Sequence, residues 1–199
     1  MVSSQVMTSH HKAIMGTKGI RNPAEYTVLG ILLRGPLHGY DMCRRLGEGI
    51  GSIWRLGKSQ IYALLAKLER EGLVIHERVG QDNLPAKNIF SLTTEGGRVV
   101  KDWLEQPVHH IRNMRLEFLT KLWFAGQASP DRELLLIEKQ LDVCREKAGA
   151  LARLKDSCGN QVEVLSIDFR VTIIKATVSW LEGLLDSIEM GNPNERKGV

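Results

Sequence analysis

Apolar side chains recur three or four residues apart in four stretches of the N-terminal half and alternate with polar ones in two shorter stretches. The first spacing predicts amphipathic helices, and the second predicts β-strands with one buried face. We expect the helices at about 22–34, 38–49, 58–71 and 93–106. The strands are expected at 73–79 and 87–92, with a turn-rich tip at 80–86. Helices and a hairpin in this order predict a winged helix-turn-helix domain.

Residue types that favour helix ends support these boundaries. Asn22 and Pro23 are preferred at a helix N-cap and at the first helical position. Gly72 suits the left-handed residue that follows a helix. Thr93 suits the N-cap of the helix after the second strand.

The helix expected at 58–71 has two different faces when its residues are placed about 100° apart. One face is apolar and contains Ile61, Leu64, Leu65 and Leu68. The other contains no acid and carries Ser59, Tyr62, Ala63, Ala66, Lys67 and Arg70. Small residues let a backbone approach a DNA groove, and cations meet phosphates or base edges. By itself this pattern fits a DNA-reading helix and a solvated surface helix equally well.

The C-terminal half is helical in pattern throughout. One helix is expected at 115–125, before Gly126 and Ser129-Pro130 interrupt the pattern. The next spaces its apolar residues alternately three and four apart, which is typical of a helix–helix seam. The seam contains Leu134, Ile137, Leu141, Cys144, Ala148 and Leu151. After a turn at 157–160, Asn160 is expected to cap the last helix, with Glu163 completing a capping box.

The last helix carries apolar residues on two faces. One face contains Val162, Leu165, Phe169, Ile173, Ala176, Trp180, Leu184 and Ile188. The other contains Ile167, Val171, Ile174, Val178, Leu181 and Leu185. Such a helix must be covered on two sides, either by a second copy of the chain or by the N-terminal domain. We expect a homodimer whose interface includes Leu141, Phe169, Ile173, Trp180 and Leu184.

Charge is divided unevenly along the 199 residues. Residues 1–107 hold 14 lysines and arginines against 10 acidic residues, whereas residues 108–199 hold 13 of each kind. The formal net charge of +4 therefore lies in the half with the winged-helix pattern. This distribution favours a polyanionic partner for the N-terminal half.

Several other classes of protein are disfavoured by features that the sequence lacks. No apolar run approaches the roughly 18 residues of a membrane span, and the N-terminus has no apolar signal-peptide core. Three cysteines without metal-ligand spacing predict free thiols in a reducing cytoplasm. Metal-ligand spacings and phosphate-cradling glycine loops are absent as well. We therefore expect neither a cofactor nor an enzymatic activity.

Four segments resemble the PadR-like transcriptional regulators, namely 30–46, 59–74, 89–104 and 115–125. Their most specific parts are the turn Pro36-Leu-x-Gly-Tyr and the helix motif Ile61-Tyr-x-x-Leu-x-x-Leu-Glu-x-x-Gly-Leu. The resemblance implies a winged-helix domain and a helical region that forms a homodimer. It also implies repression or regulation of nearby genes, often relieved by a small effector.

This resemblance also implies which residues contact DNA. Ser59, Gln60 and Tyr62 match the recognition-helix motif, and Lys87 matches a basic position of the wing. Asn88 and Phe90 stand where the family more often has a second cation and a tyrosine, which bears on the wing–phosphate contact. We expect double-stranded DNA to contact Lys58, Ser59, Gln60, Tyr62, Lys67, Arg70 and Lys87. The alternative, a winged helix that binds only protein, predicts an uncharged or apolar outer face on this helix.

Aromatic residues near the expected dimer contact are either plain core or a surface that stacks on an aromatic effector. They are Trp103, Phe118, Trp123, Phe124 and Trp180. The predicted fold class is mainly α, with a winged helix-turn-helix domain, a two-stranded β-wing and a C-terminal helical dimerisation domain. The expected divisions are a loose arm at 1–21, the winged-helix domain at 22–107, the dimerisation domain at 108–190 and a disordered tail at 191–199.

Overall fold

The computed structural model describes residues 21–81, 84–155 and 157–190. The expected arm, apart from Arg21, and the expected tail lie outside these ranges. Within them, none of the helices combines the length and the apolar character that crossing a membrane requires.

The winged-helix part has the expected order of elements. Its helices and long strands are α1 (Pro23–Ile31), α2 (Gly39–Gly49), α3 (Lys58–Arg70), β2 (Val74–Gln81), β3 (Leu84–Leu92) and α4 (Thr94–Glu105). Asn22 caps α1 by accepting a 3.0 Å hydrogen bond from the backbone N–H of Ala24. Thr93 caps α4 in the same way, with a 3.0 Å bond from Gly96. Gly72 follows α3 with a φ of +72°, as predicted.

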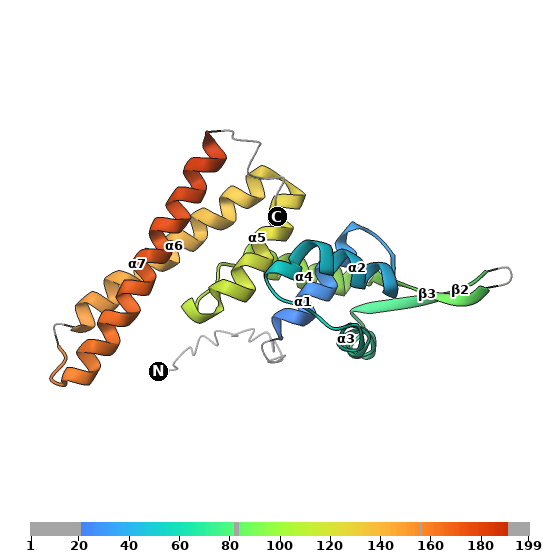
Figure 1. Cartoon of the computed structure of the whole chain (residues 1–199), viewed down its shortest axis with the longest axis horizontal. Coiled ribbons are helices and arrows are strands. Elements are labelled where there is room, and N and C mark those ends of the chain that lie inside the picture. Colours follow the sequence, from blue (N-terminus) through green and yellow to red (C-terminus); the bar gives the residue numbers. More distant parts are fainter. Residues whose placement is uncertain (1–20, 82–83, 156, 191–199) are drawn as a thin grey trace, which may run out of the picture.

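The sheet differs from the predicted two-stranded wing in two respects. A short strand, β1 (Leu37–His38), pairs with β3 and makes an antiparallel sheet of order β1-β3-β2. Two residues are too few to give an alternating pattern, so the sequence could not indicate this strand. The tip predicted at 80–86 is also too long, because β2 reaches Gln81 and β3 starts at Leu84. The hairpin extends well beyond the helices (Figure 1). Strands without further neighbours tolerate glycine and proline, which explains why the strands continue into the predicted tip.

The C-terminal part begins with a connector at residues 106–113, which contains a short 3₁₀ turn (Ile111–Asn113), and continues with three α-helices. A π-helical turn (Met114–Phe118) runs into α5 (Leu119–Ala128), followed by α6 (Pro130–Lys155) and α7 (Gln161–Glu189). The interruption predicted at Gly126 is wrong, since α5 continues through it and ends just before Ser129. Asn160 caps α7 as predicted, accepting a 2.9 Å bond from Val162. Helices α6 and α7 pack along each other at the far end of the molecule from the hairpin (Figure 1).

Two hydrophobic clusters correspond to these two parts. The first contains residues of α1, α2, α3 and α4 and of the base of the sheet. The second contains residues of the connector and of α5, α6 and α7. The predicted seam of α6 lies in the second cluster from Ile137 to Leu151, whereas Leu134 is not part of that cluster, and Leu141 is only 2% exposed. Leu141, which is expected at the dimer interface, is therefore packed within its own chain, and its place in that interface stays a prediction.

Candidate nucleic-acid interface

One face of α3 is fixed in the core, and this orients the other face outward. Ile61, Leu65 and Leu68 are at most 1% exposed and pack toward α1 and α2. The residues about half a helical turn away are exposed to solvent, as their spacing predicted. We call the exposed set the reading face, which consists of Lys58, Ser59, Gln60, Tyr62 and Arg70.

The N-terminal end of α3 is open toward solvent. Gly57 is its N-cap residue and has no side chain that accepts a hydrogen bond from the first turn. That turn contains no acidic residue and begins with Lys58, Ser59 and Gln60, all exposed. The first N–H groups of a helix lack partners inside it and favour anions. This end of α3 is therefore suited to a phosphate group.

Tyr62 is held by the close approach of α2. A Cβ added at Gly39 would lie 2.6 Å from the Tyr62 hydroxyl, so the glycine leaves room for the tyrosine ring. Tyr40, at the start of α2, is 59% exposed, and the Lys58 ammonium lies 6.0 Å from the centre of its ring. Sequence reasoning did not select Tyr40 for DNA contact. The signal that could have identified Tyr40 is its position in the turn Pro36-Leu-x-Gly-Tyr, which resembles the family motif.

Lys67 differs from the other cations of α3. Its ammonium lies 2.8 Å from a carboxylate oxygen of Glu25, a buried residue of α1. Arg21 pairs with the same carboxylate at 3.1 Å and also with Glu71. Lys67 thus holds α3 against α1, which makes it a weaker candidate for phosphate contact than the exposed cations of the reading face.

The wing presents cations on both faces of the hairpin. Lys87 is exposed and lies opposite Val79 in the antiparallel register. Asn88 lies opposite the exposed Arg78, so this pair points to the other face of the hairpin. Arg78 is a cation that sequence reasoning missed, although it lies in a predicted strand. Phe90 is 5% exposed in the core, so its difference from the family pattern has no direct bearing on phosphate contact.

Besides the reading face of α3, helix α7 carries a large face that the rest of the described chain leaves exposed. Its exposed apolar residues are Val162, Leu165, Phe169, Ile173 and Trp180, which we call the α7 outer face. Phe169 is 67% exposed, whereas Ile174 and Leu181, on the face that packs against α6, are at most 3% exposed. Leu184, also expected at the dimer interface, is half-buried beside the second cluster. The rest of the described chain thus covers only one of the two predicted apolar faces.

The five aromatic residues expected around an effector are not brought together in one cavity. The Trp123 and Phe124 rings lie against Gly49 and Gly30, where an added Cβ would approach within 2.2 and 2.5 Å. These two rings attach α5 to the winged-helix part, so we assign them to packing. Phe118 and Trp180 form a separate edge-to-face pair at 6.1 Å. Trp103 stacks on Tyr26 instead, with ring centres 4.5 Å apart.

A buried lysine lies where the two parts of the chain meet. Lys121 of α5 is 1% exposed, and its ammonium lies 3.0 Å from Glu117 and 4.7 Å from the centre of the Trp103 ring. It also donates a 2.8 Å hydrogen bond to the carbonyl of Gln106, just after α4. Burial lowers the pKa of Lys121, while the pairing with Glu117 acts in the opposite direction. The contacts of this side chain tie α5 to the end of α4.

Comparison with known proteins adds independent findings. The model of the family "Transcriptional regulator PadR-like family" matches residues 28–102. The negative transcriptional regulator PadR of Bacillus subtilis is 30% identical over 178 residues, which cover 83% of this chain and 97% of that protein. Two similar solved structures are those of Bacillus subtilis PadR in complex with operator DNA and with p-coumaric acid. Each is 27% identical and covers 84% of this chain and 99% of that chain, with TM-scores of 0.45 and 0.40 respectively.

Proposed function

Because the chain belongs to the PadR-like family of transcriptional regulators, we propose that it represses transcription as a homodimer bound to a two-fold symmetric DNA operator. The observation that carries the proposal is the reading face of α3, which is exposed, acid-free and open at its N-terminal end. The proposed organisation assigns DNA binding to residues 22–107 and dimerisation to residues 108–190.

Base reading is assigned to the first turn of α3. Gln60 presents an amide that can both donate to and accept from the edge of an adenine. Ser59 adds a hydroxyl beside it, and both side chains are exposed. The first residues of a recognition helix enter deepest into the major groove in helix-turn-helix proteins.

Phosphate contacts fix the register of the helix without selecting a sequence. We assign them to Lys58, Tyr62 and Arg70 of the reading face and to Lys87 of the wing, all of which are exposed. Lys67 contributes less in this proposal, because its ammonium already pairs with Glu25. We add Arg78 and Tyr40 as two further residues that contact the DNA phosphate backbone.

The dimer is proposed to form through the α7 outer face. A helix with five exposed apolar residues on one face needs a partner. In a two-fold dimer the same patch would contact its own copy. The two α3 helices would then enter successive major grooves about 34–36 Å apart.

Repression and its relief by a small aromatic effector are proposed from relatives. The Bacillus subtilis relative is named as a negative regulator, and one solved structure of that protein contains p-coumaric acid. The aromatic residues of this chain are mostly engaged with one another or with glycines. Binding of an aromatic compound among them would therefore require these contacts to change.

Selection of genomic DNA fragments with the purified full-length protein tests the proposal. We expect enrichment of a short inverted repeat with half-sites one helical turn apart. In gel shifts, Gln60→Ala should weaken binding to this repeat, whereas Lys101→Ala, an exposed lysine of α4, should bind as the wild type does.

Two outcomes would contradict the proposed function. One is failure to enrich any sequence at low salt, where electrostatic binding is strongest. The other is capture of a partner protein through α3 with no affinity for DNA. That result would instead support a winged helix used for protein contact.

A further inference from the structure

Three side chains meet where the winged-helix part joins the helical part. They are Trp103 of α4, Glu117 of the π-helical turn and Lys121 of α5, which we call the junction cluster. The Trp103 indole N–H donates a 3.2 Å hydrogen bond to a Glu117 carboxylate oxygen, and the Lys121 ammonium lies 3.0 Å from the same oxygen. Lys121 also lies 4.7 Å from the centre of the Trp103 ring. Each member of the junction cluster therefore contacts the other two.

The junction cluster bridges the two hydrophobic clusters of the molecule. Trp103 belongs to the first, and its ring stacks on Tyr26 of α1 with ring centres 4.5 Å apart. Phe118, the residue after Glu117, is fully buried in the second. Because one end of the junction cluster is anchored in each part, a change in the angle between the two parts would break its contacts.

The π-helical turn that carries Glu117 is supported by the same contacts. Turns of this kind are rare and occur mostly singly, frequently at functional sites. Besides Trp103 and Lys121, the side-chain amide of Asn113 donates a 3.3 Å hydrogen bond to the Glu117 carboxylate. The Glu117 side chain is only 18% exposed. Removal of the Lys121 cation would leave this poorly hydrated carboxylate with neutral donors, so we expect the geometry of the turn to depend on Lys121.

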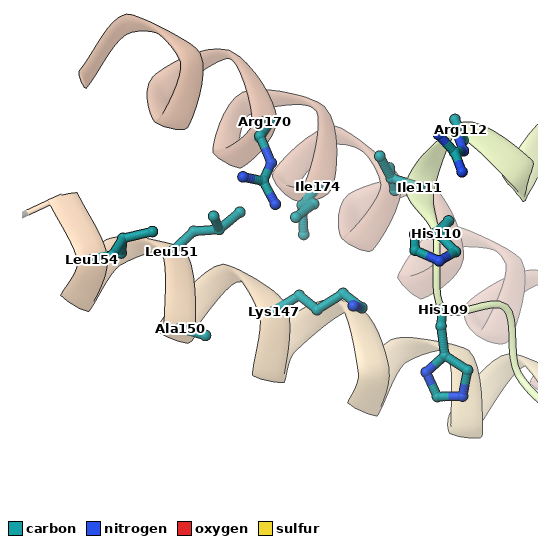
Figure 2. Close-up of a pocket in the computed structure, with 10 residues that line it drawn as sticks. All are labelled: His109, His110, Ile111, Arg112, Lys147, Ala150, Leu151, Leu154, Arg170 and Ile174. Atoms are coloured by element: carbon teal, nitrogen blue, oxygen red, sulfur yellow. The ribbon is translucent and has the colours of Figure 1, made fainter. Parts of the chain in front are cut away.

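The connector between α4 and the π-helical turn is also held in place. Gln140 of α6 is 1% exposed, and its amide makes two hydrogen bonds, of 2.6 and 2.9 Å, with the backbone of Val108. Lys121 donates a 2.8 Å hydrogen bond to the carbonyl of Gln106. The following residues, from His109 to Arg112, lie beside α6 and α7 (Figure 2). The connector therefore has fixed partners in the helical part and is not a loose linker.

The angle at this junction determines where the two reading faces lie in a two-fold dimer. One base pair added between the half-sites moves a half-site by about 3.4 Å along the DNA and rotates it by about 35° around the axis. A rigid junction cannot follow both changes, whereas a loosened junction can. Discrimination between half-site spacings therefore requires that the junction of each protomer keep one angle.

We propose that Trp103, Glu117 and Lys121 are positioning residues that set the half-site spacing of the operator. They contact no DNA and act by keeping one angle between the winged-helix part and the helical part. The α7 outer face provides the axis of the dimer, and the junction cluster fixes each reading face relative to that axis. This role rests on the proposed function, because a half-site spacing exists only for a dimer on a two-fold operator.

Competition gel shifts with the full-length protein test this role. The DNAs are the selected operator, the same operator with one base pair added or removed between its half-sites, and a single half-site. We expect the wild type to bind the altered spacings at least about tenfold more weakly than the selected one, because either the DNA or the protein must deform. In Lys121→Met this preference should fall at least about threefold, while affinity for the single half-site stays within about twofold of the wild type.

Three further variants separate positioning from folding. Trp103→Phe removes the indole N–H but keeps a ring against Tyr26, and it should also reduce the spacing preference. Lys121→Arg keeps the cation and should restore most of the preference that Lys121→Met loses. Lys101→Met makes the same substitution at an exposed lysine of α4 and should leave the preference unchanged.

The outcomes distinguish this role from the proposed function. Lower thermal stability of Lys121→Met and Trp103→Phe with an unchanged spacing preference would overturn the positioning role and leave the junction cluster a role in folding alone. A wild type that binds all spacings equally would also overturn it, although the proposed function would stand. Failure of the wild type to bind any DNA would refute the proposed function and the positioning role with it. Where circular dichroism shows that Lys121→Met does not fold, Trp103→Phe decides between these outcomes.

Discussion

The reading face of α3 and the α7 outer face are both helical surfaces that the rest of the described chain leaves uncovered, and their chemistry is opposite. The reading face presents Lys58, Gln60 and Arg70 beside Ser59 and Tyr62. The α7 outer face presents Phe169 at 67% and Leu165 at 60% exposure. Exposed cations are stable in water without a partner, whereas a continuous apolar stripe is not.

The two faces therefore depend on their partners to different degrees. The α7 outer face gains free energy in any assembly that removes it from water, so its partner is needed whenever the protein is folded. The reading face gains only where phosphates and base edges replace water, and that gain falls with salt. The first face is therefore expected to be occupied permanently and the second conditionally.

The largest expected effect follows from placing a charge on the α7 outer face. In Phe169→Glu, dimerisation through this face would remove one added carboxylate of each protomer from water. We expect the dissociation constant of the dimer to rise about a hundredfold or more, since unpaired buried charges cost several kcal/mol. Sedimentation equilibrium measures the change.

Lys175→Glu is the matched control for that experiment. It introduces the same acid on an exposed position of α7, on a different face from Phe169. We expect its dimer to remain intact. A dimeric Phe169→Glu variant, or a wild type that sediments as a monomer, would contradict the assignment of this face to self-association.

A smaller effect is expected for base reading by α3. Gln60→Ala removes one bidentate amide, and each good pair of this kind contributes about 1–3 kcal/mol of discrimination. Preference for the selected operator over unrelated DNA should therefore fall roughly ten- to hundredfold, with dimerisation unchanged. Competition gel shifts measure this ratio. If Gln60→Ala weakens binding to all sequences equally, the residue contacts phosphate and does not read bases.

Loss of a phosphate contact is expected to lower DNA affinity by a smaller amount, and equally for all DNA sequences. Replacing Lys58 or Lys87 by alanine should make the plot of log affinity against log salt shallower by about 0.9 per lost contact, twice over in a dimer. Lys67→Ala is the informative comparison, because Glu25 already pairs with its ammonium. We expect Lys67→Ala to lower folding stability, with little effect on the salt slope. Equal slopes for the Lys58 and Lys67 variants would mean that the ion pair opens when DNA binds.

Much of this arrangement could be predicted from the sequence, because periodic burial leaves a local signature. The apolar spacing gave the inner face of α3 and both faces of α7, and the capping residues located the helix starts near Asn22, Thr93 and Asn160. The two-residue strand β1 left no such signature. Gly126 was misjudged because the helix around it is held by packing, which offsets the weak helix propensity of glycine.

The partners of individual side chains were harder to predict than the faces. Lys67 and Leu141 lie on the expected faces of their helices, yet one is paired with Glu25 and the other is buried by its own chain. Both outcomes depend on residues distant in sequence, which a periodic pattern does not specify.

The smallest expected effect concerns Lys121, at the junction that positions the two faces relative to each other. Burial lowers its pKa in the folded state below the usual 10.5, so between the two values the unfolded chain binds more protons. The contribution of Lys121 to the free energy of unfolding should therefore increase as pH rises toward about 10.5. Burial raises the pKa of Tyr26 above 10.0, which acts with the opposite sign at higher pH. The wild type must therefore be compared with Lys121→Met, which keeps Tyr26. Urea unfolding of both from pH 7 to 10 should show the wild type gaining stability relative to the variant. A wild type that loses stability relative to the variant as pH rises would mean that Glu117 outweighs burial in setting this pKa.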